Sequence, residues 1–279
     1  MSGQSNKHGL SRDVPDPIKR QVRQRCGFGC VKCGFAIYHY HHFNPPFEDA
    51  KEHNPDGITL LCGRCHDRMN RGLLSSDVIN AHNRDPKCLQ EGFSHDVFDV
   101  GNQHPVVVLG YSTWINTKVI LEVFGSPLLE IEPPESAGTP FRLSGIFYDQ
   151  SGKQIFRIVQ NEWQGPIANW DIETKGRRVI IRRAPRQITL QIRSAPPNSL
   201  IIERLDLFYK GAHVIGEEGK QITAIAPDGS TIQGANTLDD RLDRPGIQLG
   251  HVTGIACEAG IVVLKDSVIF GRKCQVVSG

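Results

Sequence analysis

The sequence of 279 residues contains no run of eighteen apolar residues, so it offers no candidate for a transmembrane helix. Its first twenty residues, MSGQSNKHGLSRDVPDPIKR, are polar and lack the apolar core of a secretory signal peptide. The chain also lacks any low-complexity tract, and its apolar and charged fractions are those of a soluble globular protein. We therefore expect a cytoplasmic protein, in which the eight cysteines are thiols or metal ligands rather than disulfides.

Net charge is close to balance at +2, but it is unevenly distributed along the chain. Residues 1–90 contain 13 Lys and Arg against 9 Asp and Glu, which is +4, and the remainder contains 19 against 21, which is −2. Six of the eight cysteines and eight of the eleven histidines also precede residue 100. Such a concentration of thiol and imidazole side chains is typical of metal binding.

The local sequence patterns change near residues 95–103 and predict two domains, 1–100 and 104–279. The first carries helical patterns over 16–25 and 75–85, each stopped or started by Pro or Ser, with short apolar strands between them. The second contains β-branched runs separated by turn sequences such as DQSG and APPNS, which favour an antiparallel sandwich or barrel. The last sixty residues predict further short strands, either in hairpins or in a small coil of parallel strands. The fold class is therefore α+β.

Two pairs of cysteines in the first domain have the spacing of zinc ligands. Cys30-Val-Lys-Cys33 and Cys62-Gly-Arg-Cys65 are C-x2-C pairs separated by 28 residues. Each pair can present two sulfurs to one ion from a tight turn, and two turns complete a tetrahedron. A closed set of four thiolates predicts a structural Zn²⁺ site, although buried thiols, a redox pair, or a pairing of Cys26 with Cys30 are alternatives. Cys88, Cys257 and Cys274 are interpreted as ordinary core or surface thiols.

Histidines cluster between and just after these cysteine pairs. His41 and His42 end the strand sequence YHYHHF, and His66 directly follows Cys65. The zinc site would bring His66 close to the strand, where a few imidazoles can hold a divalent cation and leave coordination positions open for a phosphate. A neighbouring imidazole that is not a ligand can accept the proton of an attacking water. The alternative interpretation is a surface cluster that merely covers the zinc site.

The combination of these motifs over residues 11–95 closely resembles the HNH (ββα-metal) nuclease family. The resemblance is carried by the basic sequence before the first cysteine pair, the strand YHYHHF, and ITLLCGRCHDRMNRGLLSSDV. It implies a zinc-braced ββα-metal domain in which His42 is the general base and His41 and His66 hold the catalytic cation, Mg²⁺ or Mn²⁺. Asn70, one turn after His66, is a candidate third ligand or phosphate contact.

The sequence departs from the family pattern at Gly57, where the family usually has an asparagine that fixes the loop behind the base. Asn54 and Asp56 lie nearby and are candidates to take over that role. The departure leaves open a module that has kept the zinc fold and DNA binding but lost turnover.

DNA is the partner that the basic residues of the first domain suggest, because Lys and Arg contacts to phosphates give affinity with little sequence preference. A bacterial, antiviral defence effector, whose β-rich domain senses a signal and controls the nuclease, is a third hypothesis. That domain is also where a protein partner or a second copy of the chain would bind. The arginines assigned to DNA are Arg20, Arg23, Arg25, Arg64, Arg68 and Arg71.

Overall fold

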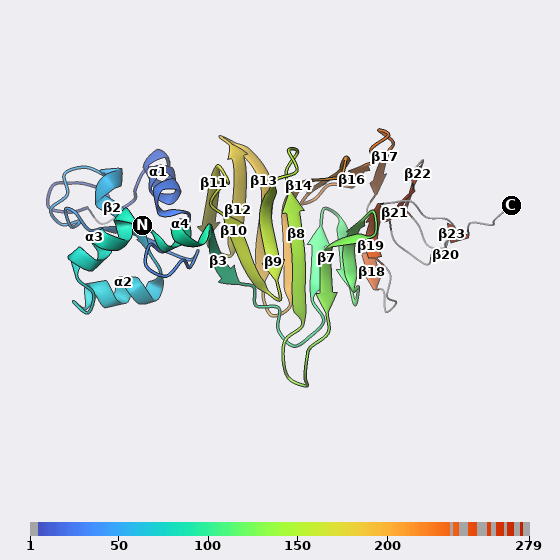
Figure 1. Cartoon of the computed structure of the whole chain (residues 1–279), viewed down its shortest axis with the longest axis horizontal. Helices are drawn as coiled ribbons and strands as arrows, with labels where there is room; N and C mark the ends of the chain where they lie inside the picture. The colour runs from blue at the N-terminus through green and yellow to red at the C-terminus, as the bar shows by residue number, and fades with distance from the viewer. Residues whose placement is uncertain are drawn as a thin grey trace. The chain divides into compact units, whose positions relative to one another are not determined.

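A computed structural model of the chain describes residues 5–234, 237–239, 245–249, 256–257, 261–264, 267–270 and 274–275. The chain forms two compact units, of which the first comprises Met1–Asp96 and Gln164–Thr174 and the second Val97–Trp163 and Lys175–Gly279. All α-helices of the described residues lie in the first unit, and most strands lie in the second (Figure 1). No helix among the described residues is both long and apolar enough to span a membrane. The α+β class predicted from the sequence is confirmed.

The first unit consists of four helices around a small antiparallel sheet. The strands are β1 (His39–His42) and β2 (Ile58–Leu61), and a short 3₁₀ helix, η1 (Pro55–Gly57), precedes β2. The helices are α1 (Asp16–Cys26), α2 (Gly63–Asn70), α3 (Ser76–Arg84) and α4 (Lys87–Glu91).

Local sequence accounts for the ends of the two predicted helices. Proline in the first turn of α1 fits a position where no backbone N–H is required, and Gly27 ends that helix in the left-handed conformation, at φ 70°. At the start of α3, the side chain of Ser75 accepts a hydrogen bond from the amide of Val78, as an N-cap serine should. The buried residues of α1 are Val22, Arg23 and Cys26, so one arginine lies on its buried face.

Strand β2 is the centre of the core of the first unit. All four of its residues are buried, and Ile58, Leu60 and Leu61 pack with Val22 of α1 and Ile79 of α3. The antiparallel register pairs His39 with Leu61, His41 with Thr59 and His42 with Ile58. The histidine strand β1 is therefore held along its length by a fully buried neighbour, which fixes the positions of its imidazoles.

Most strands of the second unit belong to two large, mainly antiparallel sheets, which also include β3 (Phe93–Val97) and β11 (Asp171–Lys175). The predicted β-branched runs all form strands, and alternation places Phe147, Phe156 and Trp163 in the core. One sheet has the order β22 (Ser267–Phe270), β21 (Ile261–Leu264), β19 (Pro245–Leu249), β6 (Val119–Val123), β7 (Ser126–Glu132), β8 (Arg142–Tyr148), β9 (Gln154–Val159), β10 (Glu162–Pro166) and β3 (Phe93–Val97).

The other large sheet has the order β11 (Asp171–Lys175), β12 (Arg178–Ala184), β13 (Gln187–Ala195), β14 (Ser199–Tyr209), β15 (Ala212–Glu217), β16 (Ile222–Ile225) and β17 (Thr231–Gly234). Outside this path, β4 (Val106–Leu109) pairs with β14 and β5 (Ser112–Ile115), and β18 (Thr237–Asp239) pairs with β5. Strands β20 (Ala256–Cys257) and β23 (Cys274–Gln275) form a separate pair.

The described strands near the end of the chain pair in both orientations. Strands β21 and β22 pair antiparallel, whereas β19 pairs parallel with both β6 and β21. Strands β19, β21 and β22 therefore extend one of the large sheets.

The boundary between the units differs in one respect from the division at residues 95–103. The first unit ends at Asp96 and then takes back Gln164–Thr174, a segment that sequence analysis assigns to the β-rich domain. The chain consequently passes between the units three times, within β3, β10 and β11. The segment Gln164–Thr174 is far in sequence from the rest of the first unit, so no local sequence pattern indicates its place there.

Candidate functional site

The four predicted zinc ligands come together in the first unit. The sulfurs of Cys30, Cys33, Cys62 and Cys65 all lie within 4.8 Å of one another. Four thiolates around one zinc at about 2.3 Å lie about 3.8 Å apart, so this spacing fits a tetrahedral ion. Among the described residues, no other group of three His, Cys, Asp or Glu ligand atoms is this close. The cluster is consistent with a structural Zn²⁺ site.

Backbone geometry explains why these cysteines converge. The amide of Gly34 donates to the carbonyl of Cys30 at 2.9 Å, which closes a tight turn around the first pair. Cys62 is the N-cap of α2 and Cys65 lies in its first turn, where the helix dipole favours thiolates. A hydrogen bond from the Cys33 thiol lowers the pKa of Cys30 to about 5, whereas burial raises the pKa of Cys65 to about 12. A bound cation would remove this competition between neighbouring thiolates.

Cys26 is not part of this cluster. It is fully buried in α1, and its sulfur lies 3.9 Å from the hydroxyl of Thr59. Cys88 is also buried, and its thiol donates to the carbonyl of Gly34 at 3.5 Å. Both are core thiols, so the alternative pairing of Cys26 with Cys30 is wrong. Cys257 and Cys274 face each other in the register of β20 and β23, and their side chains lie outside the described residues.

Three imidazoles meet between β1 and α2. The ring centroid of His66 lies 5.2 Å from that of His41 and 5.1 Å from that of His39. Alternation along the strand puts His39 and His41 on the same face, toward α2. Two rings that share one cation at about 2.1 Å per nitrogen have centroids about 5 Å apart, but the nitrogens of these three histidines do not group as closely as the cysteine sulfurs do. Burial and the neighbouring His66 and His42 lower the pKa of His41 to about 4, which keeps the imidazole neutral as a ligand must be.

Asn70 lies next to His66, as their spacing of four residues predicts. Its side-chain nitrogen is 3.3 Å from Nδ1 of His66. An amide in this position can also present its oxygen to the ring, which would leave Nε2 of His66 as the nitrogen facing a cation. The geometry thus supports Asn70 as the residue that orients His66, while its role as a direct ligand stays a prediction.

His42 has a partner that sequence analysis did not identify. Its Nε2 lies 3.1 Å from Nδ1 of His53, in the loop between β1 and β2. If Nε2 carries the proton and donates it to His53, the lone pair of His42 Nδ1 is available to accept another. Burial, His53 and the positive charge of Arg12 lower the pKa of His42 to about 4. His53 stands eleven residues from His42 in an irregular loop, so neither spacing nor periodicity indicates it.

Arg12 is a second residue that the sequence did not single out. Its positive charge contributes to lowering the pKa of both His42 and His66, which places it beside the histidine cluster. Its guanidinium also lies 4.8 Å from the centroid of the Phe47 ring. An exposed guanidinium at this position can contact a phosphate bound at the histidines.

The structure leaves no room for a side chain at Gly57, where an asparagine is expected. A β-carbon at this position would overlap the carbonyl oxygen of Asn44, just after the histidine strand. The carbonyl of Gly57 accepts hydrogen bonds from the amides of Phe43 and Asn44, at 3.0 and 3.3 Å. Asn54 caps η1 by accepting from the amide of Asp56. Backbone contacts of Gly57 thus hold the loop behind His42.

Two of the six arginines assigned to DNA stabilise the fold. Arg23 is only 4% exposed and donates to both carboxylate oxygens of Asp171 at 2.8 Å and to the hydroxyl of Tyr40 at 2.9 Å. Arg25 donates to the carbonyl oxygens of Pro55 and Ile58 around η1. Both guanidinium groups already have acceptors inside the unit, which gives them a structural role, while their assignment to DNA stays a prediction.

The other four arginines are more accessible. Arg20 lies over the ring of Trp170, 5.0 Å from its centroid, and Arg71 pairs with Asp67 at 3.0 Å. Arg64 and Arg68 are exposed and form no ion pair within the described part of the chain.

No family model, curated protein or solved structure matches this chain.

Proposed function

We propose that the first unit is an HNH-type endonuclease that hydrolyses phosphodiester bonds of DNA. The observation that carries the proposal is the meeting of His41 and His66, with ring centroids 5.2 Å apart, beside the four-cysteine cluster. The succession of β1, β2 and α2 supports the ββα-metal fold. The hydrogen bond between His42 and His53 further supports a division between cation ligands and a general base.

In the proposed reaction, Nδ1 of His42 accepts a proton from water. The water oxygen forms a bond to phosphorus and the bond from phosphorus to the 3′ oxygen breaks. The departing 3′ oxygen takes a proton from solvent, which gives 5′-phosphate and 3′-hydroxyl ends. His53 keeps the proton of His42 on Nε2, and Arg12 contacts the phosphate. His41 and His66 would hold Mg²⁺ or Mn²⁺, which supplies charge stabilisation at the phosphate and the departing oxygen when bound.

The test is incubation of the purified protein with supercoiled plasmid and with single-stranded DNA, with and without Mg²⁺ or Mn²⁺. We expect nicking that requires the cation and is lost in His66→Ala. Arg84→Gln is a suitable control, because this exposed residue is at the end of α3 and has no assigned role. If the wild-type protein binds DNA but nicks none in any divalent cation, the unit is a binding module and not a nuclease.

A further inference from the structure

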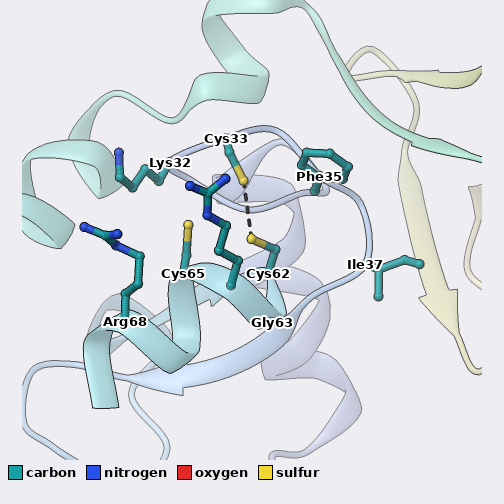
Figure 2. A pocket seen from close by; sticks show the side chains of 9 residues that line it. Lys32, Cys33, Phe35, Ile37, Cys62, Gly63, Cys65 and Arg68 are labelled. Carbon is teal, nitrogen blue, oxygen red and sulfur yellow. Dashed lines mark hydrogen bonds between the residues drawn. The ribbon is translucent and has the colours of Figure 1, made fainter. Parts of the chain in front are cut away.

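A second site lies on the outer side of the four-cysteine cluster. A pocket of about 630 Å³ opens there, and its walls include the sulfurs of Cys33, Cys62 and Cys65. Figure 2 shows Lys32 and Arg68 on one side of these sulfurs and Phe35 and Ile37 on the other. The pocket therefore has a cationic end and an apolar end, and its volume is in the range of small-molecule sites.

Among the described residues, no Asp or Glu pairs with the cationic end. Lys32, Arg64 and Arg68 line it, and none of them forms an ion pair with a described residue. Arg71, on the same helix but outside the pocket, is neutralised by Asp67. Four zinc-bound thiolates carry a net charge of about −2, which offsets only part of the charge of these three cations, and a phosphate would balance the remainder.

Hydrogen bonds of the backbone fix the position of the apolar end of the pocket. Phe35 is 42% exposed and Ile37 61% exposed, although both are large apolar side chains. Ala36 between them is buried, its amide donates to the carbonyl of His95 at 2.9 Å, and its carbonyl accepts from the hydroxyl of Thr174. These bonds fix the segment so that its two apolar side chains stay exposed at the pocket.

The pocket is separate from the histidine site. At 100° per residue, Arg64 and Arg68 lie on one flank of α2, while His66 and Asn70 lie about 200° around it. Cys65 and the half-buried Met69 occupy the side of the helix between them that faces the core. One phosphate cannot bind at the histidines and in the pocket at the same time. Any ligand of the pocket is therefore a different group from the phosphate at the histidines.

We propose that this pocket binds a nucleoside phosphate. Guanidinium groups match the oxygens of a phosphate, which assigns the anionic group to Arg64, Arg68 and Lys32. A nucleobase is a flat apolar surface that stacks on aromatic rings, which assigns the base to Phe35 and Ile37. The ligand is either a free nucleotide or one nucleotide of a strand, and its binding does not depend on hydrolysis at the histidines.

The experiment measures fluorescence anisotropy with the full-length, zinc-loaded protein. The probes are mononucleotides carrying a methylanthraniloyl group on the ribose and a fluorescein-labelled ten-nucleotide DNA strand. We expect saturable binding that Arg68→Gln and Phe35→Ala each weaken about tenfold or more. Arg84→Gln should bind as the wild type does, because Arg84 is exposed at the end of α3, has no assigned role and lies outside the pocket. Zinc content, measured for each variant, verifies that the cysteine cluster is intact.

The two probes distinguish the source of the ligand, since a free nucleotide site binds the mononucleotide and a strand site binds only the oligonucleotide. Equal losses in Arg68→Gln and Arg84→Gln would mean nonspecific charge attraction and overturn the proposal. Unchanged binding in Phe35→Ala would do the same, as would equal competition by an acidic peptide of glutamate and phenylalanine. Plasmid nicking, assayed in parallel, reports on the histidine site independently of these outcomes.

Discussion

At the scale of single residues, the histidines of β1 have different partners and therefore different expected roles. His41 faces the ring of His66, whereas His42 is hydrogen-bonded to His53. We expect His42→Ala to lower the nicking rate by about 10² to 10⁴ while Mn²⁺ and DNA binding persist. His53→Ala should cost about 10- to 100-fold, because it removes only the group that orients the base.

His41→Ala and His66→Ala should instead weaken Mn²⁺ binding, with partial recovery of nicking at high cation concentration. Mn²⁺ affinity and nicking rate are measured together for each variant. Loss of Mn²⁺ binding in His42→Ala, with full binding in His41→Ala, would show that the two roles are reversed.

Gly57 is the second prediction at this scale. Gly57→Ala places a methyl group on the carbonyl oxygen of Asn44, so the loop after β1 must shift. We expect a loss of about 1–3 kcal/mol in the free energy of unfolding, measured by urea denaturation. Gly63→Ala is the matched control, since a β-carbon there meets no atom within 4 Å and alanine favours a helix. If both variants are equally stable, the loop is not constrained at Gly57.

At the scale of elements, the two segments that carry the C-x2-C pairs meet at the four-cysteine cluster. We expect about one zinc per chain in protein purified without added metal, because binding to four thiolates is coupled to folding. Cys30→Ser or Cys65→Ser should lose the zinc and unfold the first unit, as followed by metal analysis and circular dichroism. Cys26→Ala should keep the zinc, since Cys26 is buried outside the cluster. A folded, metal-free Cys65→Ser protein would refute the site.

Strands β12, β13 and β14 share a buried carboxylate. Glu203 is 6% exposed; burial alone would raise its pKa, but hydrogen bonds from Arg178, Gln191 and Arg193 lower it to about 2. The unfolded chain therefore binds more protons than the folded one between pH 4.5 and 2. Stability from Glu203 is present above pH 4.5 and is lost as pH falls through this window, by no more than about 3 kcal/mol.

Urea denaturation of the wild type and Glu203→Gln at several pH values between 7 and 2 tests this prediction. Glu203→Gln should be less stable at pH 7, and its stability should fall less between pH 4.5 and 2. Parallel pH curves for the two proteins would show that another carboxylate is responsible.

At the scale of the whole molecule, the ion pair of Arg23 and Asp171 joins residues 148 positions apart. Removing one partner of a buried pair leaves an uncompensated charge, so Asp171→Asn should destabilise the first unit by about 3–5 kcal/mol. Asp67→Asn breaks an exposed pair in the same unit and should cost less than about 1 kcal/mol. Thermal unfolding and zinc release report on the unit; equal effects of the two variants would contradict this account.

A fragment of residues 1–103 should be less stable than the same unit in the full chain, because it lacks Asp171. In that fragment, Arg23→Met should be neutral or stabilising, whereas in the full chain it should be destabilising. The difference between the two backgrounds measures the contribution of the returning segment directly.

The sequence predicted what depends on local spacing. C-x2-C pairs, the N-cap at Ser75 and the β-branched strands each follow from a few adjacent residues. It did not predict the bond between His42 and His53 or the ion pair of Arg23 and Asp171, because both depend on how the chain returns in space. Arginine in a basic helix favours a solvent-exposed interpretation, and only the acceptor contributed from a distant strand makes Arg23 a core residue.

The return of Gln164–Thr174 to the first unit also has a consequence for biosynthesis. Ribosomes elongate at about 5–20 residues per second, so Asp171 follows Arg23 by about 7 to 30 s. During this interval the histidine strand, the cysteine turns and an unpaired Arg23 already exist outside the ribosome. The N-terminal unit thus becomes complete only after Val97–Trp163 of the β-rich unit has been translated, although still before Lys175–Gly279 of that unit exists.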